Sequence, residues 1–131
     1  MNDFGKLIVK RALEAKQNNI NKESEGQANK NDNIDCKSRM DLIPTRFMRE
    51  FGYLMLYGSV KYAENNWRKG LPLSRWTGAA LRHLNAFQSG EEIDLESGIH
   101  HLIMVCFNCM AMYEQQHEEK MIKFDDRIKE R

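Results

Sequence analysis

The chain has 131 residues, of which 41% are hydrophobic and 30% are charged, and its formal net charge is +1. This length suits one compact domain better than two, and the small net charge gives no global basic field for binding nucleic acid. No apolar run is long enough to span a membrane. Three cysteines do not make a disulfide framework, so we expect a cytoplasmic protein.

The first third of the chain predicts a short helix followed by a polar linker. Residues 3–16 repeat apolar side chains at helical spacing. Residues 17–39 are rich in Asn, Lys, Ser and acidic residues and have almost no large apolar side chains. Such a segment buries too little surface to offset its ordering entropy, so we predict a flexible linker, which this composition can leave disordered. Residues 1–39 then precede a helical domain over residues 40–131.

Three further helices are predicted in that domain. The first begins near Thr45, which follows a proline, and ends before a pair of asparagines. The second is capped by Ser74 and stopped by Gly90, and the third, capped by Asp94, continues into a charged helical tail from about Glu114. No segment predicts a strand, so the fold class is all-α, a helical bundle.

Polar residues left over from the apolar stripes fall into groups that share a helix face or a connection. The predicted groups are Glu50, Tyr57, Lys61 and Glu64 on the first helix, Arg82 and His83 on the second, and Glu96 and His100 on the third, after the acidic run EEIDLE. Each group alone is typical of ordinary solvated or structural positions. Together, carboxylates, imidazoles and cations are the composition that holds a divalent cation against a polyphosphate and activates a water.

Several of these segments also match a family pattern in order and spacing. The segments are GSVKYAENNWRKG, AALRHLNAFQSGEEIDLESG and HHLIMVCFNCMAMYE. The matching residues are Gly58, Lys61, Tyr62, Asn66, Trp67, Lys69, Gly70, Arg82, His83, Asp94, Glu96, Ser97, Gly98 and His101. The chain resembles the phage dATP/dGTP diphosphohydrolase N-terminal domain family, which is grouped with the helical MazG-type nucleoside triphosphate pyrophosphohydrolases.

This resemblance implies a MazG-like helical bundle and metal-dependent hydrolysis of a purine (deoxy)nucleoside triphosphate to monophosphate and pyrophosphate. The implied cofactor is Mg²⁺ or Mn²⁺, and the implied partner is a purine nucleotide. The resemblance further implies a homo-oligomer, a dimer or tetramer, located in the host cytoplasm if the protein is phage-encoded. Neither a membrane nor a nucleic acid is indicated as a partner.

The resemblance also suggests residue roles. The expected catalytic residues are Glu50, Glu96 and His83, and the expected metal ligands are Glu50, Asp94, Glu96 and His101. The expected substrate-binding residues are Lys61, Tyr62, Asn66, Trp67, Lys69 and Arg82. Among these, the cations would neutralise phosphate charge, Asn66 would hydrogen-bond a base or sugar, and Trp67 would stack on the base.

Two other functions remain open. Three residues after His101, where the family pattern leads us to expect a second histidine, the chain has Met104. Because a thioether is not a ligand for Mg²⁺, which takes oxygen ligands, this position favours a catalytically weakened module that binds or sequesters a nucleotide. The other alternative is a helical interaction protein that uses the linker and tail to bind partners.

Overall fold

The computed structural model describes residues 3–17 and 38–127, in two compact units that are treated separately, Met1–Ile43 and Pro44–Arg131. The first unit contains helix α1, Asp3–Gln17, and the short 3₁₀ helix η2, Met40–Leu42. The predicted helix over residues 3–16 is confirmed, whereas most of the predicted linker lies on residues 18–37, outside the described residues. None of the described helices is long and apolar enough to cross a membrane.

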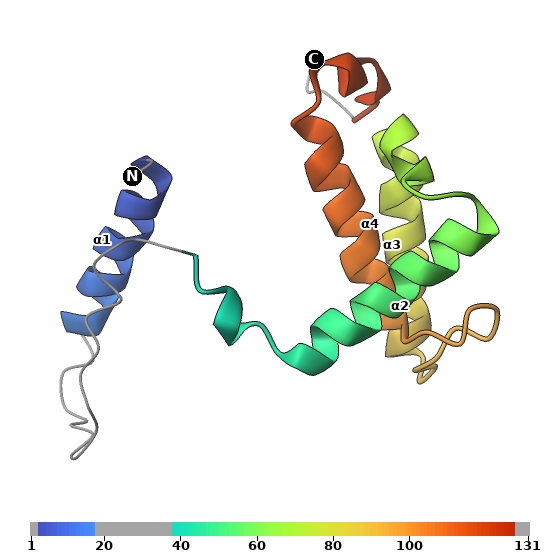
Figure 1. Cartoon of the computed structure of the whole chain (residues 1–131), viewed down its shortest axis with the longest axis horizontal. Coiled ribbons are helices and arrows are strands. Elements are labelled where there is room, and N and C mark those ends of the chain that lie inside the picture. Colours follow the sequence, from blue (N-terminus) through green and yellow to red (C-terminus); the bar gives the residue numbers. More distant parts are fainter. Residues whose placement is uncertain (1–2, 18–37, 128–131) are drawn as a thin grey trace. The chain divides into compact units, whose positions relative to one another are not determined.

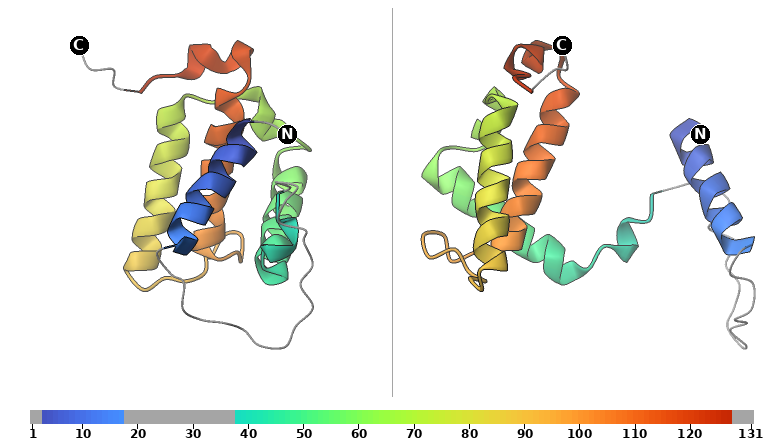
Figure 2. Two further views of the ribbon diagram at one scale, coloured as in Figure 1. Left: turned by 90° about the vertical axis from the view of Figure 1, so that its left-hand side faces the viewer. Right: turned by 180° about the vertical axis from the view of Figure 1, so that it is seen from behind.

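The second unit is built from α2, Thr45–Lys61, α3, Leu73–Gln88, and α4, His101–Gln116, with 3₁₀ helices η3, Asn66–Lys69, and η4, Glu119–Phe124. Helices α3 and α4 lie side by side and antiparallel, α2 crosses them near the start of α4, and η4 lies at the opposite end (Figures 1 and 2). The all-α expectation is confirmed over the described residues, where the β pairing is limited to a bridge between Ile93 and His100.

Two apolar clusters hold these helices together. Leu54 from α2 packs with Ile99 and Ile103, and Leu73 and Trp76 from α3 pack with Ala111 of α4. The side chain of Phe107, on α4, contacts both clusters. The core therefore runs along α4, with α2 on one side and α3 on the other.

The start of α4 differs from the sequence prediction, which placed an N-cap at Asp94. Its carboxylate instead accepts hydrogen bonds from the N–H (2.9 Å) and hydroxyl (2.6 Å) of Ser97, and its backbone N–H donates to Ile99. Gly98 has φ +71°, which a helix cannot contain. These contacts close a turn, and α4 begins only at His101.

The start of α3 and the C-terminal tail also differ from expectation. Ser74 lies inside α3, and its N–H (2.9 Å) and hydroxyl both donate to Asp126 from the tail. The tail is not a continuation of α4, because α4 ends at Gln116 and η4 folds back with Met121 buried. The tail residue Asp126 therefore accepts a hydrogen bond from a backbone N–H in the first turn of α3, which has no partner within the helix.

Candidate active site

A cavity of about 530 Å³ opens in the second unit, between the end of α2, the middle of α3 and the first half of α4. Cavities that bind drug-sized ligands usually measure about 300–1,000 Å³. Its polar lining combines cations, carboxylates and an imidazole, namely Lys61, Arg82, Asp94, Glu96 and His83. The cavity is thus large enough for a small molecule and carries both signs of charge.

Apolar and aromatic side chains line the rest of the cavity, among them Trp67, Trp76 and Phe107. The Trp76 indole N–H donates to Gln115 (3.0 Å), and its ring meets Phe107 edge to face at 6.1 Å between centroids. Because Trp76 is buried and hydrogen-bonded, this wall is fixed before any ligand arrives. An apolar wall beside fixed charges suits a ligand with a flat ring and an anionic group.

On the rim, a contact between Lys61 and Glu96 joins α2 to the loop before α4. The Lys61 ammonium donates to Glu96 Oε1, and the hydroxyl of Tyr57 donates to the same oxygen at 3.1 Å. The hydrogen bond from Lys61 lowers the pKa of Glu96, and Glu96 raises the pKa of Lys61. Both side chains are solvent-accessible, so this pair stays open to competition from an anion in the cavity.

The turn after α2 brings the KYAENNWRKG segment to the cavity. Asn65 adopts a left-handed conformation with φ +58°, which asparagine tolerates better than most residues. Asn66 and Trp67 then line the cavity at the start of η3. The Trp67 indole N–H is buried without a hydrogen-bond partner among the described residues, and the Arg68 guanidinium lies 4.5 Å from its ring centre.

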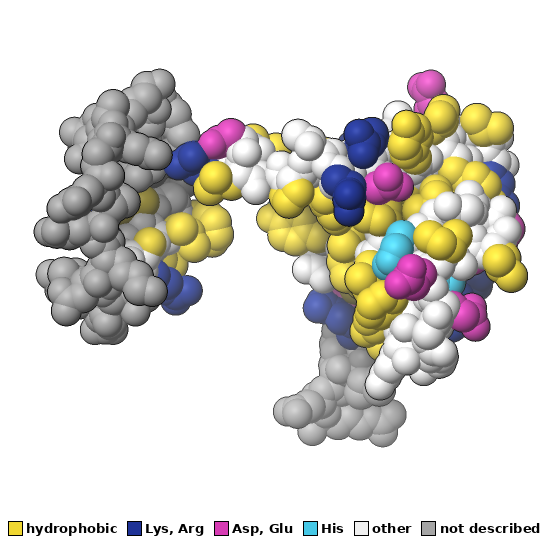
Figure 3. Space-filling view, turned by 90° about the horizontal axis from the view of Figure 1, so that it is seen from below, with side chains coloured by type: hydrophobic (Ala, Val, Ile, Leu, Met, Phe, Trp, Pro, Cys, Tyr) yellow, Lys and Arg dark blue, Asp and Glu magenta, His cyan; other side chains and the backbone are white. Residues whose placement is uncertain are grey.

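A second polar cluster joins α3, the loop and the first residue of α4. The Nδ1 atoms of His83 and His101 are 2.9 Å apart, and ligand atoms of His83, Asp94 and His101 all lie within 4.8 Å of one another. We call these three residues the metal group. Figure 3 shows histidine and acidic side chains next to each other among hydrophobic ones on this unit.

Burial and hydrogen bonding shift the pKa values of His83 and Asp94. Burial lowers the pKa of His83, and the neighbouring His101 lowers it further. Burial acts to raise the pKa of Asp94, but the hydrogen bonds from Ser97 outweigh it and keep that pKa below its usual value. A lower pKa favours the neutral imidazole of His83 and the ionised carboxylate of Asp94, which are the forms that bind a metal ion.

The structure brings most of the predicted site residues together. Those that line the cavity are Lys61, Tyr62, Asn66, Trp67, Arg82, His83, Asp94 and Glu96. His101 joins them through the metal group. Glu50 and Lys69 line neither the cavity nor that group over the described part of the chain, so their roles stay predictions.

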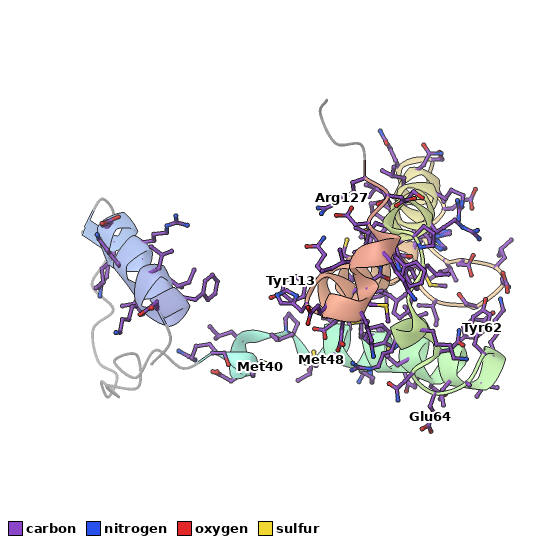
Figure 4. The ribbon with its side chains drawn as sticks, turned by 90° about the horizontal axis from the view of Figure 1, so that it is seen from above. Met40, Met48, Tyr62, Glu64, Tyr113 and Arg127 are labelled. Atoms are coloured by element: carbon purple, nitrogen blue, oxygen red, sulfur yellow. The ribbon has the colours of Figure 1, made fainter. Side chains whose placement is uncertain are left out.

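Two of the predicted groups do not form as expected, because Glu64, Glu96 and His100 lie outside the helices. Glu64 follows the end of α2 at Lys61, and Figure 4 shows its side chain directed away from the helices. Glu96 and His100 lie in the loop before α4, where His100 accepts from the N–H of Leu102 at 3.1 Å. Glu96 therefore faces Lys61 rather than His100.

Sequence reasoning missed Asn108, which is buried on α4 and lines the cavity. The available signal was its spacing, because Asn108 follows His101 by seven residues within an apolar helix. Residues seven apart lie nearly on the same face of a helix. Polar residues that recur on one face of an otherwise apolar helix indicate that this face lines a polar site.

Fold and cavity together define an all-α protein whose cavity combines cationic, acidic and aromatic side chains beside the metal group. Residues 27–127 match the model of a family described as dATP/dGTP diphosphohydrolase, N-terminal. The match covers most of the chain, and the chain belongs to this family.

A dATP/dGTP diphosphohydrolase of Salmonella phage PMBT28 is 34% identical to this chain over 77 residues. That stretch covers 59% of this chain and 26% of the phage protein, so the chain spans a minor part of that relative's length. No solved structure matches the chain.

Proposed function

We propose that the second unit hydrolyses a purine (deoxy)nucleoside triphosphate, such as dATP or dGTP, to the monophosphate and pyrophosphate, with a divalent metal ion. The observation that carries this proposal is one cavity with cations, carboxylates, the metal group at its edge and an aromatic wall. Family membership supports a nucleotide substrate. The proposal includes the MazG-like bundle type and a homo-oligomeric assembly.

The metal group has a donor set that fits a divalent cation. His101 is buried, and its Nε2 atom has no hydrogen-bond partner among the described residues. Two imidazoles and one carboxylate favour a transition-metal ion such as Mn²⁺ over Mg²⁺, which prefers oxygen ligands. A bound ion would supply Lewis-acid stabilisation of phosphate charge and a more acidic water.

The remaining roles follow from charge and position. Arg82 and Lys61 would bind phosphate oxygens, and a phosphate would compete with Glu96 for the Lys61 ammonium. Released from Lys61, Glu96 would keep the hydrogen bond from Tyr57 on Oε1 and could take a proton from the attacking water through its other oxygen. Tyr62 and Trp67 would flank the base, because flat aromatic rings stack on nucleobases.

The test is incubation of the full chain with each common NTP and dNTP plus Mg²⁺ or Mn²⁺, with monophosphate and pyrophosphate measured by chromatography. The proposal expects pyrophosphate from a purine nucleotide and its loss in Glu96→Gln. Glu92→Gln is the matched control, because Glu92 is an exposed acid of the same loop that does not line the cavity. Equal activity in both variants would remove Glu96 from the proposed chemistry.

A nucleotide-binding module without turnover is the second candidate. The observation in its favour is Met104, which lines the cavity at a position where a histidine was expected. This candidate predicts that nucleotides stay intact under every metal while one of them raises the melting temperature. Pyrophosphate release by the wild-type protein would exclude it.

A further inference from the structure

Helix α4 carries three buried polar side chains at intervals of seven residues, His101, Asn108 and Gln115. At 3.6 residues per turn, this spacing places them nearly on one face of the helix. Between them the helix is largely apolar, from Leu102 to Tyr113. A buried polar group is costly unless it has a hydrogen-bond partner, so each of the three calls for one.

Two of the three side chains have partners. Gln115 accepts hydrogen bonds from the Trp76 indole (3.0 Å) and the Leu71 N–H (3.1 Å), and donates to the Leu71 carbonyl (2.8 Å). His101 meets His83 at 2.9 Å within the metal group. Gln115 is therefore structural, and His101 belongs to the site already described.

Asn108 is only half satisfied. Its Nδ2 donates to the carbonyl of Met104 at 2.8 Å, four residues earlier on α4. Across the described part of the chain, no residue donates to its Oδ1. The side chain is 5% exposed, and it lines the cavity. The oxygen is thus an acceptor without a donor among the described residues, on a side chain that lines a ligand-sized cavity.

The chemistry of the Met104 carbonyl fixes which amide atom is left over. A carbonyl oxygen can only accept, so the NH₂ group of Asn108 must face it. A flipped amide would place two acceptors against each other. The atom available to a ligand is therefore the oxygen, and a matching ligand group must be an N–H or O–H donor.

Position along α4 separates this acceptor from the metal group. Seven residues correspond to two helical turns, or about 10 Å along the axis. Trp76 and Phe107, which also line the cavity, supply an apolar wall in the part of the cavity next to Asn108 on α4. A nucleotide with its phosphates at the metal group would reach this wall with its base.

We propose that Asn108 reads the base, its Oδ1 accepting a hydrogen bond from an N–H donor on the six-membered ring of a purine. This inference rests on the proposed function and names the recognition residue within the same cavity. Adenine offers its 6-amino group, and guanine offers its 2-amino group and the adjacent ring N–H. Unsubstituted purine carries no such donor.

The test compares binding of α,β-methylene analogues of dATP, dGTP and unsubstituted purine deoxyriboside triphosphate by calorimetry with Mn²⁺. These analogues resist cleavage between the α and β phosphates, so binding is measured without turnover. We expect wild-type protein to bind an adenine or guanine analogue at least tenfold more tightly than the purine analogue. Folded Asn108→Leu should bind all three with similar affinity, whereas Asn85→Leu, at an exposed position on α3, should discriminate like wild type.

Each contrary result has one meaning. Equal wild-type affinity for all three analogues overturns the proposal, and that comparison needs no variant to fold. If folded Asn108→Leu still discriminates between the analogues, another residue recognises the base. The proposal for Asn108 is then wrong, while the proposed function stands. No binding of any analogue by wild-type protein defeats the proposed function and this inference together.

Discussion

The two sides of the cavity are built differently. On the α2 side, Lys61, Tyr57 and Glu96 meet through hydrogen bonds between accessible side chains. On the α3–α4 side, His83 and His101 are half-buried and buried, and they meet an aspartate held by two hydrogen bonds from its own loop. One side can exchange partners with a ligand, and the other is arranged in advance.

This difference predicts different roles for the two sides of the cavity. Exposed ion pairs contribute little to stability because water screens them, so the α2 side can change partners at low cost. Preorganised groups act where charge develops during a reaction and need no rearrangement at that moment. We therefore expect substitutions on the α3–α4 side to affect turnover and metal binding most, and those on the α2 side to affect nucleotide affinity.

The largest effect is expected for Asp94→Asn. This change removes the only charged oxygen ligand of the metal group while the amide oxygen can still accept from Ser97. Activity should fall on the order of 100-fold or more, since even residues that only orient metal ligands cost about 10–100-fold. Steady-state pyrophosphate release measures it, with Glu92→Gln as the control, and unchanged activity would place the metal elsewhere.

A smaller effect is expected for Lys61→Met on the α2 side. Loss of a cation that binds phosphate should raise the KM for nucleotide roughly tenfold, the equivalent of one charge-assisted hydrogen bond, with less change in kcat. Lys120→Met is the matched comparison, because Lys120 is exposed and does not line the cavity. Equal KM values for the two variants would contradict the assignment of Lys61 to phosphate.

The residue after η3, Gly70, packs closely against η4, and Gly70→Ala should disturb that contact. A Cβ at Gly70 would lie 2.8 Å from the Phe124 ring, and Gly70 has φ +83°, so the change forces a shift and adds backbone strain. We expect a loss of about 1–3 kcal/mol in the free energy of unfolding. Urea titration measures it, and a neutral result would show that η4 does not depend on this contact.

Gly52→Ala is the counterpart of that change. Nothing lies within 4 Å of a Cβ at Gly52, which is inside α2. Alanine is favoured over glycine in a helix interior by about 0.5–1 kcal/mol. A gain in stability of that size is expected from the same titration, and a loss would indicate a contact that α2 makes elsewhere.

The smallest effect concerns pH and the tail contact at Asp126. Hydrogen bonds from Ser74 lower the pKa of Asp126. A carboxyl whose pKa is lower in the folded state stabilises the protein above its unfolded pKa and loses that contribution as pH falls through the folded value. The melting temperature of wild type should thus exceed that of Asp126→Asn at neutral pH and converge with it in acid. A constant difference across pH would contradict the pKa shift.

Local sequence signals predicted much of this fold and fewer of its connections. The proline before Thr45 and the stop at Gly90 mark helix ends through backbone geometry alone, and α2 begins and α3 ends where the sequence indicates. Asp94 was placed wrongly as a helix cap, because a cap and a closed turn have the same local residue types. Which one forms depends on Ser97 and Gly98 together.

The sequence predicted those residues of the candidate site that belong to the family pattern. The family pattern includes His83, Asp94 and His101, and the structure brings these three residues together. It does not show that Glu50 and Lys69 lie outside the cavity lining, because distances between elements cannot be derived from spacing. Asn108 lies outside the family pattern, and its interval of seven residues from His101 is the sequence signal that marks it.

Manganese binding measured by electron paramagnetic resonance, with and without an α,β-methylene purine deoxynucleoside triphosphate, tests the central claim most directly. The claim is that one cavity holds a nucleotide against a metal at His83, Asp94 and His101. The account predicts that the nucleotide tightens Mn²⁺ binding, by reciprocal linkage, and that Asp94→Asn abolishes this tightening. An affinity for Mn²⁺ that changes with neither the nucleotide nor the substitution would contradict the claim.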